Sequence, residues 1–149
     1  MIRHRKNRPF SILKISSKQI SKDVCSLFHI EPGAKDRKIC FPDLSSKKLQ
    51  LAFVRGLFDG DGSVSNPYGR KEYKYPACSI ASYSDDVKKA IRELFDSVNV
   101  TSSKIEWSGD EAMKVMSMIY DDALLYLPRK RERFEVWKCI RSFRKSSPF

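Results

Sequence analysis

The sequence predicts an α+β fold in which amphipathic helices accompany short strands paired as an antiparallel sheet. Two observations carry this prediction. Apolar residues recur at helical spacing in several stretches, and shorter stretches between them alternate apolar and polar side chains. The 149 residues, of which 41% are hydrophobic, are enough for one domain with a buried core and are not typical of a disordered chain.

The first 48 residues predict a strand, a helix and a second short strand. Residues 10–16 alternate as a strand does, and residues 17–28 place apolar side chains on one helical face behind a serine cap. Residues 37–41 predict the second strand. We expect this basic segment, 1–48, to be a partial repeat of the rest of the chain, because residues 10–30 and 77–100 share a strand, a serine-rich cap and an amphipathic helix.

We expect residues 49–149 to form the larger part of one compact unit, which also includes residues 1–48. A helix capped by Ser45 or Ser46 runs from about 47 to 58 and ends at the acidic, glycine-rich stretch 59–62. After it we expect strands at 63–65 and 74–81, a helix over 87–98, a strand at 103–107, and helices over 111–120 and 130–143.

Charge is distributed unevenly along the chain. The net charge of +11 divides into +8 over residues 1–48, −3 over 49–126 and +6 over 127–149. Two basic ends suit a polyanionic partner such as nucleic acid, although a merely solvated surface has the same composition.

Other compositional features exclude several classes of protein. No apolar run approaches the roughly 18 residues of a spanning helix, and the basic start lacks the apolar stretch of a secretory signal. The four cysteines form no CxxC pair, so we expect reduced core thiols rather than zinc ligands. The sequence therefore predicts an intracellular protein that works with nucleic acid.

A glycine interrupts the helix expected at 47–58. Gly56 should cost roughly 1 kcal/mol relative to alanine in a helix interior. Ala52, Gly56 and Gly60 fall on one helical face, where small side chains let a second helix approach closely. The stripe predicts an interface with another helix, or tight packing of this helix against its own sheet.

The end of that helix is the candidate chemical site. Asp59 and Asp61 lie within three residues, next to glycines, and Asp61 is expected just past the helix end. Carboxylate and carbonyl oxygens are ligands that hard divalent cations prefer. The alternative is an ordinary Asp-Gly turn that joins the helix to the next strand, because such a turn has the same spacing. Two such helices packed through their small faces would bring two Asp61 carboxylates together for metal-assisted hydrolysis of a phosphodiester.

Residues 53–63, FVRGLFDGDGS, resemble the motif of the LAGLIDADG homing endonucleases. The downstream order is similar to the α-β-β-α-β-β-α half-domain of that family, which implies an antiparallel, saddle-shaped sheet on DNA. The resemblance extends over about residues 10–140 and is strong at 53–63. It implies that Asp61 and the Gly60 carbonyl hold a divalent metal, Mg²⁺, that Asp59 shapes the motif, and that Lys130 acts near the scissile phosphate.

The resemblance also implies a DNA-reading surface and a second copy of the fold. The expected DNA-binding residues are Ser65, Asn66, Arg70, Lys71, Tyr73, Lys74, Ser79, Ser82, Arg129 and Arg131. The chain carries one motif, in a half-domain that the segment 1–48 precedes, whereas cutting both strands needs two carboxylates. A homodimer, or a complementary half with Ala52, Gly56 and Gly60 at the interface, is therefore expected.

Three functions are compatible with these residues. The first is a site-specific double-strand DNA endonuclease of the homing type. The second is a catalytically inactive nucleic-acid-binding protein on the same fold, such as an intron maturase or a DNA-binding regulator. The third is a structural domain whose glycine face only packs against a partner.

Overall fold

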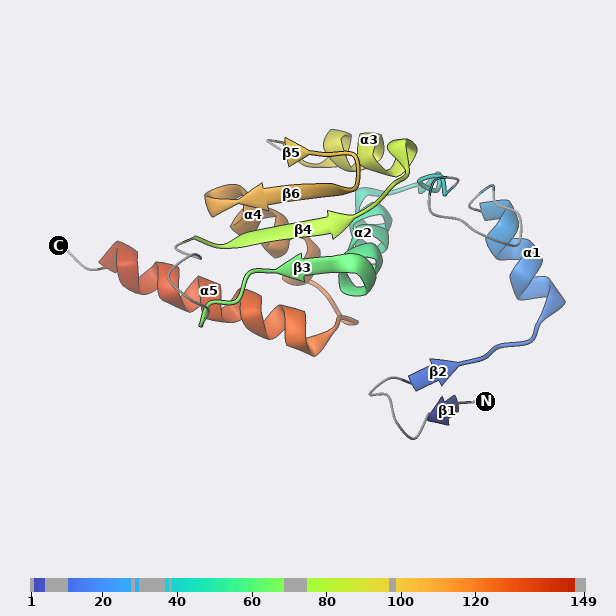
Figure 1. Ribbon diagram of the computed structural model, residues 1–149, viewed down its shortest axis with the longest axis horizontal. Coiled ribbons are helices and arrows are strands. Elements are labelled where there is room, and N and C mark those ends of the chain that lie inside the picture. Colours follow the sequence, from blue (N-terminus) through green and yellow to red (C-terminus); the bar gives the residue numbers. More distant parts are fainter. Residues whose placement is uncertain are drawn as a thin grey trace.

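A four-stranded antiparallel sheet lies at the centre of the computed structural model, which describes residues 2–4, 11–27, 29, 37, 39–68, 75–96 and 99–146. The strand order is β3-β4-β6-β5 (Figure 1). These strands are β3 (Gly62–Val64), β4 (Ala77–Ala81), β6 (Lys104–Ser108) and β5 (Asn99–Val100). The predicted α+β class with an antiparallel sheet is confirmed.

Four helices accompany this sheet. They are α2 (Lys47–Asp61), α3 (Asp85–Leu94), α4 (Gly109–Tyr120) and α5 (Pro128–Ser146). From α2 to α4 the order is α-β-β-α-β-β-α, as expected of the half-domain. Serine caps begin two of the helices: the Ser46 hydroxyl accepts from the Leu49 amide, and the Ser84 hydroxyl accepts from the Val87 amide.

The core lies between one face of the sheet and the helices. Side chains alternate along β4 and β6, so that Cys78, Ile80, Ile105 and Trp107 are buried while their neighbours face outward. The largest helix side chains buried in the same cluster are Trp137, Tyr120, Phe58 and Phe134. In Figure 1, α2 and α4 pass behind the sheet, and none of the described helices lies on the other sheet face.

The N-terminal segment forms its own small elements. The strand β1 (Ile2–His4) pairs antiparallel with β2 (Ser11–Leu13), and α1 (Lys18–Leu27) buries none of its residues. The helix expected at 17–28 is confirmed, and the Ser17 hydroxyl accepts from the amide of Ile20. That this segment is a partial repeat stays a prediction.

The short strand expected at 37–41 is wrong for its described residues at 39–41, which pair with no strand. Side chains at the start of α3 hold them instead. The Ser84 hydroxyl donates to the Ile39 carbonyl at 2.6 Å, and the Phe41 amide donates to the Asp86 carboxylate at 2.6 Å. Their backbone groups are therefore satisfied without a sheet.

Several helix boundaries in the structure differ from the predicted ones, because tertiary contacts override the local sequence pattern. The helix α2 continues through Asp61 instead of ending near Phe58, and α3 ends at Leu94 rather than running on to 98. The two-residue strand β5 was not expected at all, since two residues carry no alternation signal.

The cysteines and the helices of the described chain show two further features. Cys78 is buried, and burial raises the pKa of its thiol to about 12. Cys25 and Cys40 are half-buried and Cys139 is exposed, so the expectation that all four are core thiols is wrong. No helix in the described ranges is long and apolar enough to span a membrane.

Candidate functional site

Asp59 holds the end of α2 in place. Its carboxylate accepts a hydrogen bond from the Tyr120 hydroxyl at 2.6 Å and another from the Leu127 amide at 2.9 Å. Burial and this hydrogen bond raise the pKa of Tyr120 far above its ordinary value, so the phenol stays a donor. Asp59 therefore has the shaping role expected of it and is engaged within its own chain.

Lys130 approaches the same helix end from α5. Its side chain is buried, and its ammonium donates to the carbonyls of Phe58 at 2.5 Å and Asp59 at 3.0 Å. Burial first, and the charge of Arg129 second, hold the pKa of Lys130 below its ordinary value, while Asp59 and Asp61 oppose that shift. The described contacts assign Lys130 to holding the last turn of α2, and its role at a phosphate stays a prediction.

Asp61 differs from these two residues because it is exposed. It is the last residue of α2, and its side chain has no hydrogen-bond or ion-pair partner among the residues that the structure describes. It borders a hollow of about 320 Å³, which Ser82, Tyr83 and Leu57 also line. This is an anchored helix end that presents one free carboxylate outward.

A divalent metal fits this carboxylate only in part. Asp61 and the neighbouring Gly60 carbonyl supply hard oxygen donors of the kind that Mg²⁺ takes. Within the described ranges, no group of three His, Cys, Asp or Glu side chains could hold a metal. The remaining ligands would have to come from water, a substrate phosphate or a second chain.

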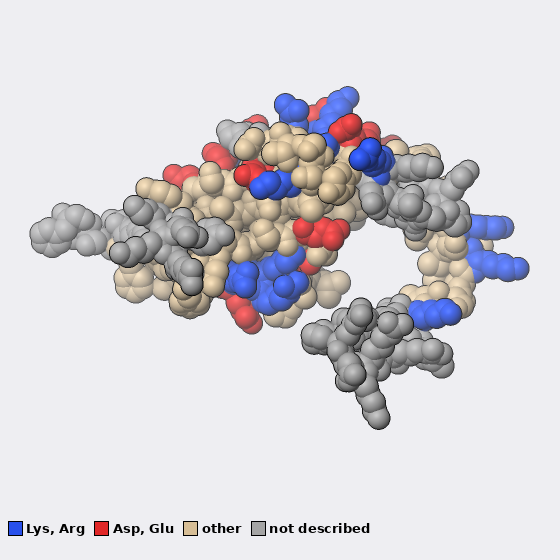
Figure 2. Space-filling model, in the orientation of Figure 1, with Lys and Arg blue, Asp and Glu red and all other residues tan. Residues whose placement is uncertain are grey.

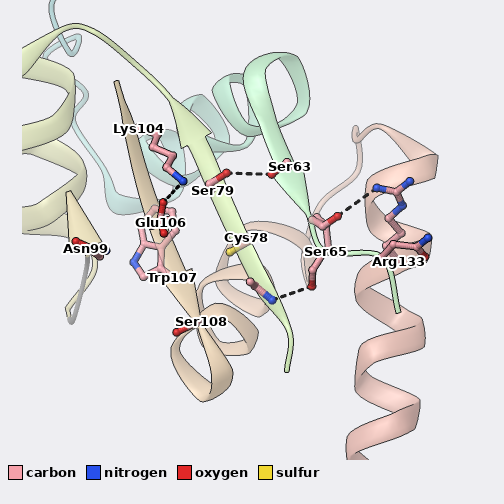
Figure 3. Close-up of a pocket in the computed structure, with 13 residues that line it drawn as sticks. Ser63, Ser65, Cys78, Ser79, Asn99, Lys104, Glu106, Trp107, Ser108 and Arg133 are labelled. Atoms are coloured by element: carbon pink, nitrogen blue, oxygen red, sulfur yellow. Dashed lines mark hydrogen bonds and ion pairs between the residues drawn. The ribbon is translucent and has the colours of Figure 1, made fainter. Parts of the chain in front are cut away.

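The sheet face that carries no helix presents small and polar side chains beside this site (Figure 3). The hydroxyls of Ser63 and Ser79 are hydrogen-bonded at 3.0 Å across β3 and β4. Lys104 and Glu106 form an ion pair along β6. These side chains line a hollow of about 430 Å³. The face is therefore open, polar and concave.

Four of the DNA-binding residues expected on the strands are described, and all lie on or near this face. The Ser65 hydroxyl accepts from the Ala77 amide, and the Asn66 side chain accepts from the Tyr68 amide. Ser79 lies within the sheet, and Ser82 borders the hollow beside Asp61. The other expected strand residues, Arg70, Lys71, Tyr73 and Lys74, lie outside the described residues.

Basic side chains gather over the first half of α5, next to an acidic patch where α2 meets β3 (Figure 2). Arg129 is exposed. Arg131 donates to the Ala123 carbonyl and lies 4.3 Å from the centre of the Tyr126 ring, so it is engaged in its own chain. Arg133 was not expected; it is exposed, donates to the Val64 carbonyl and reaches the hollow on the open face.

Residues that line this face on β5 and β6 were also missed: Asn99, Lys104 and Glu106. The alternation of residues 104–108 was a usable signal, because it separates Lys104 and Glu106 from the apolar side chains between them. What the sequence lacked was the pairing of β6 beside β4, which places both side chains in the middle of the face.

The small-residue stripe of α2 is open. A methyl group added at Gly56 or Gly60 would meet no atom of the described residues within 4 Å, and both glycines are exposed. Ala52 is half-buried. Packing against the chain's own sheet therefore does not account for the two glycines, and the predicted interface with a second helix stays a prediction.

Comparison with known proteins gives one family and two structures. A family model described as a LAGLIDADG-like domain matches residues 48–127, which is more than half of the chain. No curated protein matches this chain.

The two solved structures are complexes with DNA. The homing endonuclease I-CvuI, crystallised with an I-CreI target in the presence of 2 mM Mg with the DNA not cleaved, is 16% identical with a TM-score of 0.46; the match covers 64% of this chain and 68% of that one. The LAGLIDADG homing endonuclease I-GzeII, in complex with a DNA target, is 17% identical with a TM-score of 0.47, covering 66% and 38%.

Proposed function

Because this chain belongs to the LAGLIDADG-like domain family, we propose that it is a site-specific double-strand DNA endonuclease of the homing type, hydrolysing phosphodiester bonds with a divalent metal. One observation carries the proposal. Asp61 presents a free carboxylate at an anchored helix end, beside an open polar sheet face. The protein would act inside the cell, on double-stranded DNA.

The anchoring of α2 supports a catalytic use of Asp61. Phosphodiester hydrolysis needs oxygen donors held in one geometry. Asp59 and Lys130 fix the last turn of α2 through four hydrogen bonds, which positions the next carboxylate without occupying it. Asp61 and the Gly60 carbonyl would hold Mg²⁺, which when bound polarises the phosphate and lowers the pKa of water.

The open sheet face would bind the DNA. Hydroxyl and amide side chains can read base edges in a major groove, and those described on this face are Ser63, Ser65, Asn66, Ser79, Asn99 and Ser108. Arg129 and Arg133 of α5 would contact phosphates, which position the protein rather than specify the sequence.

Cleavage of both strands requires a second carboxylate. This chain presents one free motif carboxylate, and the stripe of Gly56 and Gly60 is open. A second copy packed on that stripe would place two Asp61 side chains together, giving a homodimer. A complementary half of the same fold would serve equally.

A nucleic-acid-binding protein without catalysis, such as a maturase or a regulator, is the second candidate. It is favoured by the buried position of Lys130, whose ammonium is directed at helix carbonyls. Such a protein would bind nucleic acid in a salt-sensitive manner without cutting it under any metal.

The test is Asp61→Asn compared with Asp122→Asn, an exposed aspartate in the loop before α5. Target duplexes are first selected for binding from a random library and then incubated with Mg²⁺ or with EDTA. We expect Asp61→Asn to bind as the wild type does and to lose cleavage by about 100-fold or more, while Asp122→Asn cuts normally. Cleavage by Asp61→Asn at the wild-type rate contradicts the assignment, and binding without cleavage by the wild type favours the second candidate.

A further inference from the structure

We propose that Glu106 and Lys104 form a specificity-determining pair that reads one C·G base pair in the major groove. The proposal rests on the proposed function, because it takes the open sheet face as the surface that lies on DNA. It concerns recognition rather than cleavage, and it can therefore fail or succeed separately.

The two side chains occupy the middle of the open face. β6 is an inner strand, with β4 on one side and β5 on the other. Glu106 is paired in register with Ser79 of β4 and with Asn99 of β5. These residues line the same hollow (Figure 3), so a duplex seated on this face would contact Glu106.

A carboxylate is an unexpected group at the centre of a surface for a polyanion. It repels phosphates, and among base edges it repels the acceptor atoms of guanine and thymine. Cytosine and adenine alone offer an amino donor in the major groove, and in adenine an acceptor nitrogen lies beside that donor. Glu106 therefore favours cytosine.

Lys104 completes the match to the whole base pair. Its ammonium contacts Glu106 directly, which lowers the electrostatic cost of a carboxylate facing DNA. Ammonium groups donate to the O6 and N7 acceptors of guanine, which lie beside the cytosine amino group in a C·G pair. The Glu106 carboxylate thus accepts from the cytosine amino group, while the neighbouring Lys104 ammonium donates to the guanine acceptors.

Structural needs do not explain the pair. The side chains of Lys104 and Glu106 are 49% and 34% exposed, and exposed ion pairs contribute little to stability. Among the described residues, the Glu106 carboxylate has no partner other than Lys104, which contacts its buried Oε2. Its other oxygen, Oε1, therefore keeps acceptor capacity for a base.

The experiment selects binding sites from a random duplex library with Asp61→Asn, which keeps the DNA intact. The same selection is made with Glu106→Gln, with Lys104→Met and with a matched control, Glu111→Gln, each added to that background. Glu111 of α4 also pairs with a lysine and its side chain is 37% exposed, but it does not line the open face.

We expect one position in each half-site to require C·G, with about tenfold weaker binding when that pair is changed. Glu106→Gln should shift this position towards A·T, because glutamine both accepts from and donates to adenine. Lys104→Met should weaken the preference at the same position, and Glu111→Gln should leave every position unchanged.

Each other outcome decides something. An unaltered preference in both Glu106→Gln and Lys104→Met overturns the inference while leaving the endonuclease proposal intact. Absence of DNA binding overturns both. A shift at that one position, in a protein that cuts no DNA under any metal, supports the inference and overturns the endonuclease.

Discussion

Lys130 lies at the end of α2 with 4% of its surface exposed, although lysines are rarely buried so fully without a partner. Its partners are two carbonyls in the last turn of the helix, that of Phe58, which also accepts from the Gly62 amide, and that of Asp59. The lysine therefore acts as a C-terminal cap supplied from another helix. The resemblance identified this residue, but only the approach of α5 to α2 could reveal its contacts.

The pKa of Lys130, lowered mainly by burial, gives a testable dependence of stability on pH. The unfolded chain holds this proton more tightly than the folded chain, so the lysine's contribution to stability rises as pH rises towards its ordinary pKa of 10.5. Lys130→Met should lower the free energy of unfolding by about 1–3 kcal/mol, because the Asp59 carbonyl loses its donor.

The measurement is urea denaturation of wild type and Lys130→Met at several pH values from 7 to 10.5. The difference in the free energy of unfolding should widen as pH rises. A difference that narrows over this range would show that the folded pKa is raised instead. Lys138→Met, which removes a half-buried lysine of α5 that pairs with Asp121 at the end of α4, serves as the control.

The residues of the site were predictable to different degrees. Asp61 was predicted and lies exposed at the helix end, because the motif encodes it locally. Glu106 was missed, because its importance depends on the strands beside it. A local motif can be read from the sequence, whereas a face assembled from four strands requires the register.

At the scale of elements, packing at the junction of α2 and β3 explains why residue 62 is glycine. Gly62 does not belong to the small-residue stripe of α2. Gly62 has extended backbone angles that any residue can adopt. A methyl group there would meet the Phe58 carbonyl oxygen, and would lie 2.8 Å from that residue's ring and 2.9 Å from its Cα. Lack of space, rather than backbone freedom, therefore requires glycine here.

This crowding predicts opposite effects for two alanine substitutions in one motif. Gly62→Ala should destabilise the fold by about 1–3 kcal/mol, since the junction must shift. Gly60→Ala meets open space and should stabilise the isolated chain by about 0.5–1 kcal/mol through helix propensity. Thermal unfolding of both variants at low protein concentration tests this pair, and equal destabilisation would contradict it.

At the scale of the whole molecule, residues 47–146 were largely predictable. Caps, helical spacing and alternation are local signals, and they predicted four helices and three of the four strands of the main sheet. The strand expected at 37–41 was wrong because α3 side chains hold its described residues. The strand β5 was missed because its pairing with β6, rather than its own two residues, defines it.

At the scale of the whole molecule, the open stripe of α2 bears on the proposed cleavage of DNA. With one exposed motif carboxylate per chain, the proposed cleavage of both strands needs a second carboxylate, which a second chain packed on Gly56 and Gly60 would supply. Gly56→Leu should fold at least as stably as the wild type, because the position is exposed and leucine favours helix. It should nevertheless block the close approach of a second helix.

Analytical ultracentrifugation with and without target DNA measures the association. We expect a wild-type dimer on DNA, a Gly56→Leu monomer that nicks one strand or cuts neither, and normal behaviour of Lys89→Leu, which places leucine on the exposed face of α3. Dimerisation and double-strand cleavage by Gly56→Leu would remove the stripe from the interface. A wild type that stays monomeric on its target would instead require a complementary half from another chain, because a single Asp61 cannot serve both strands.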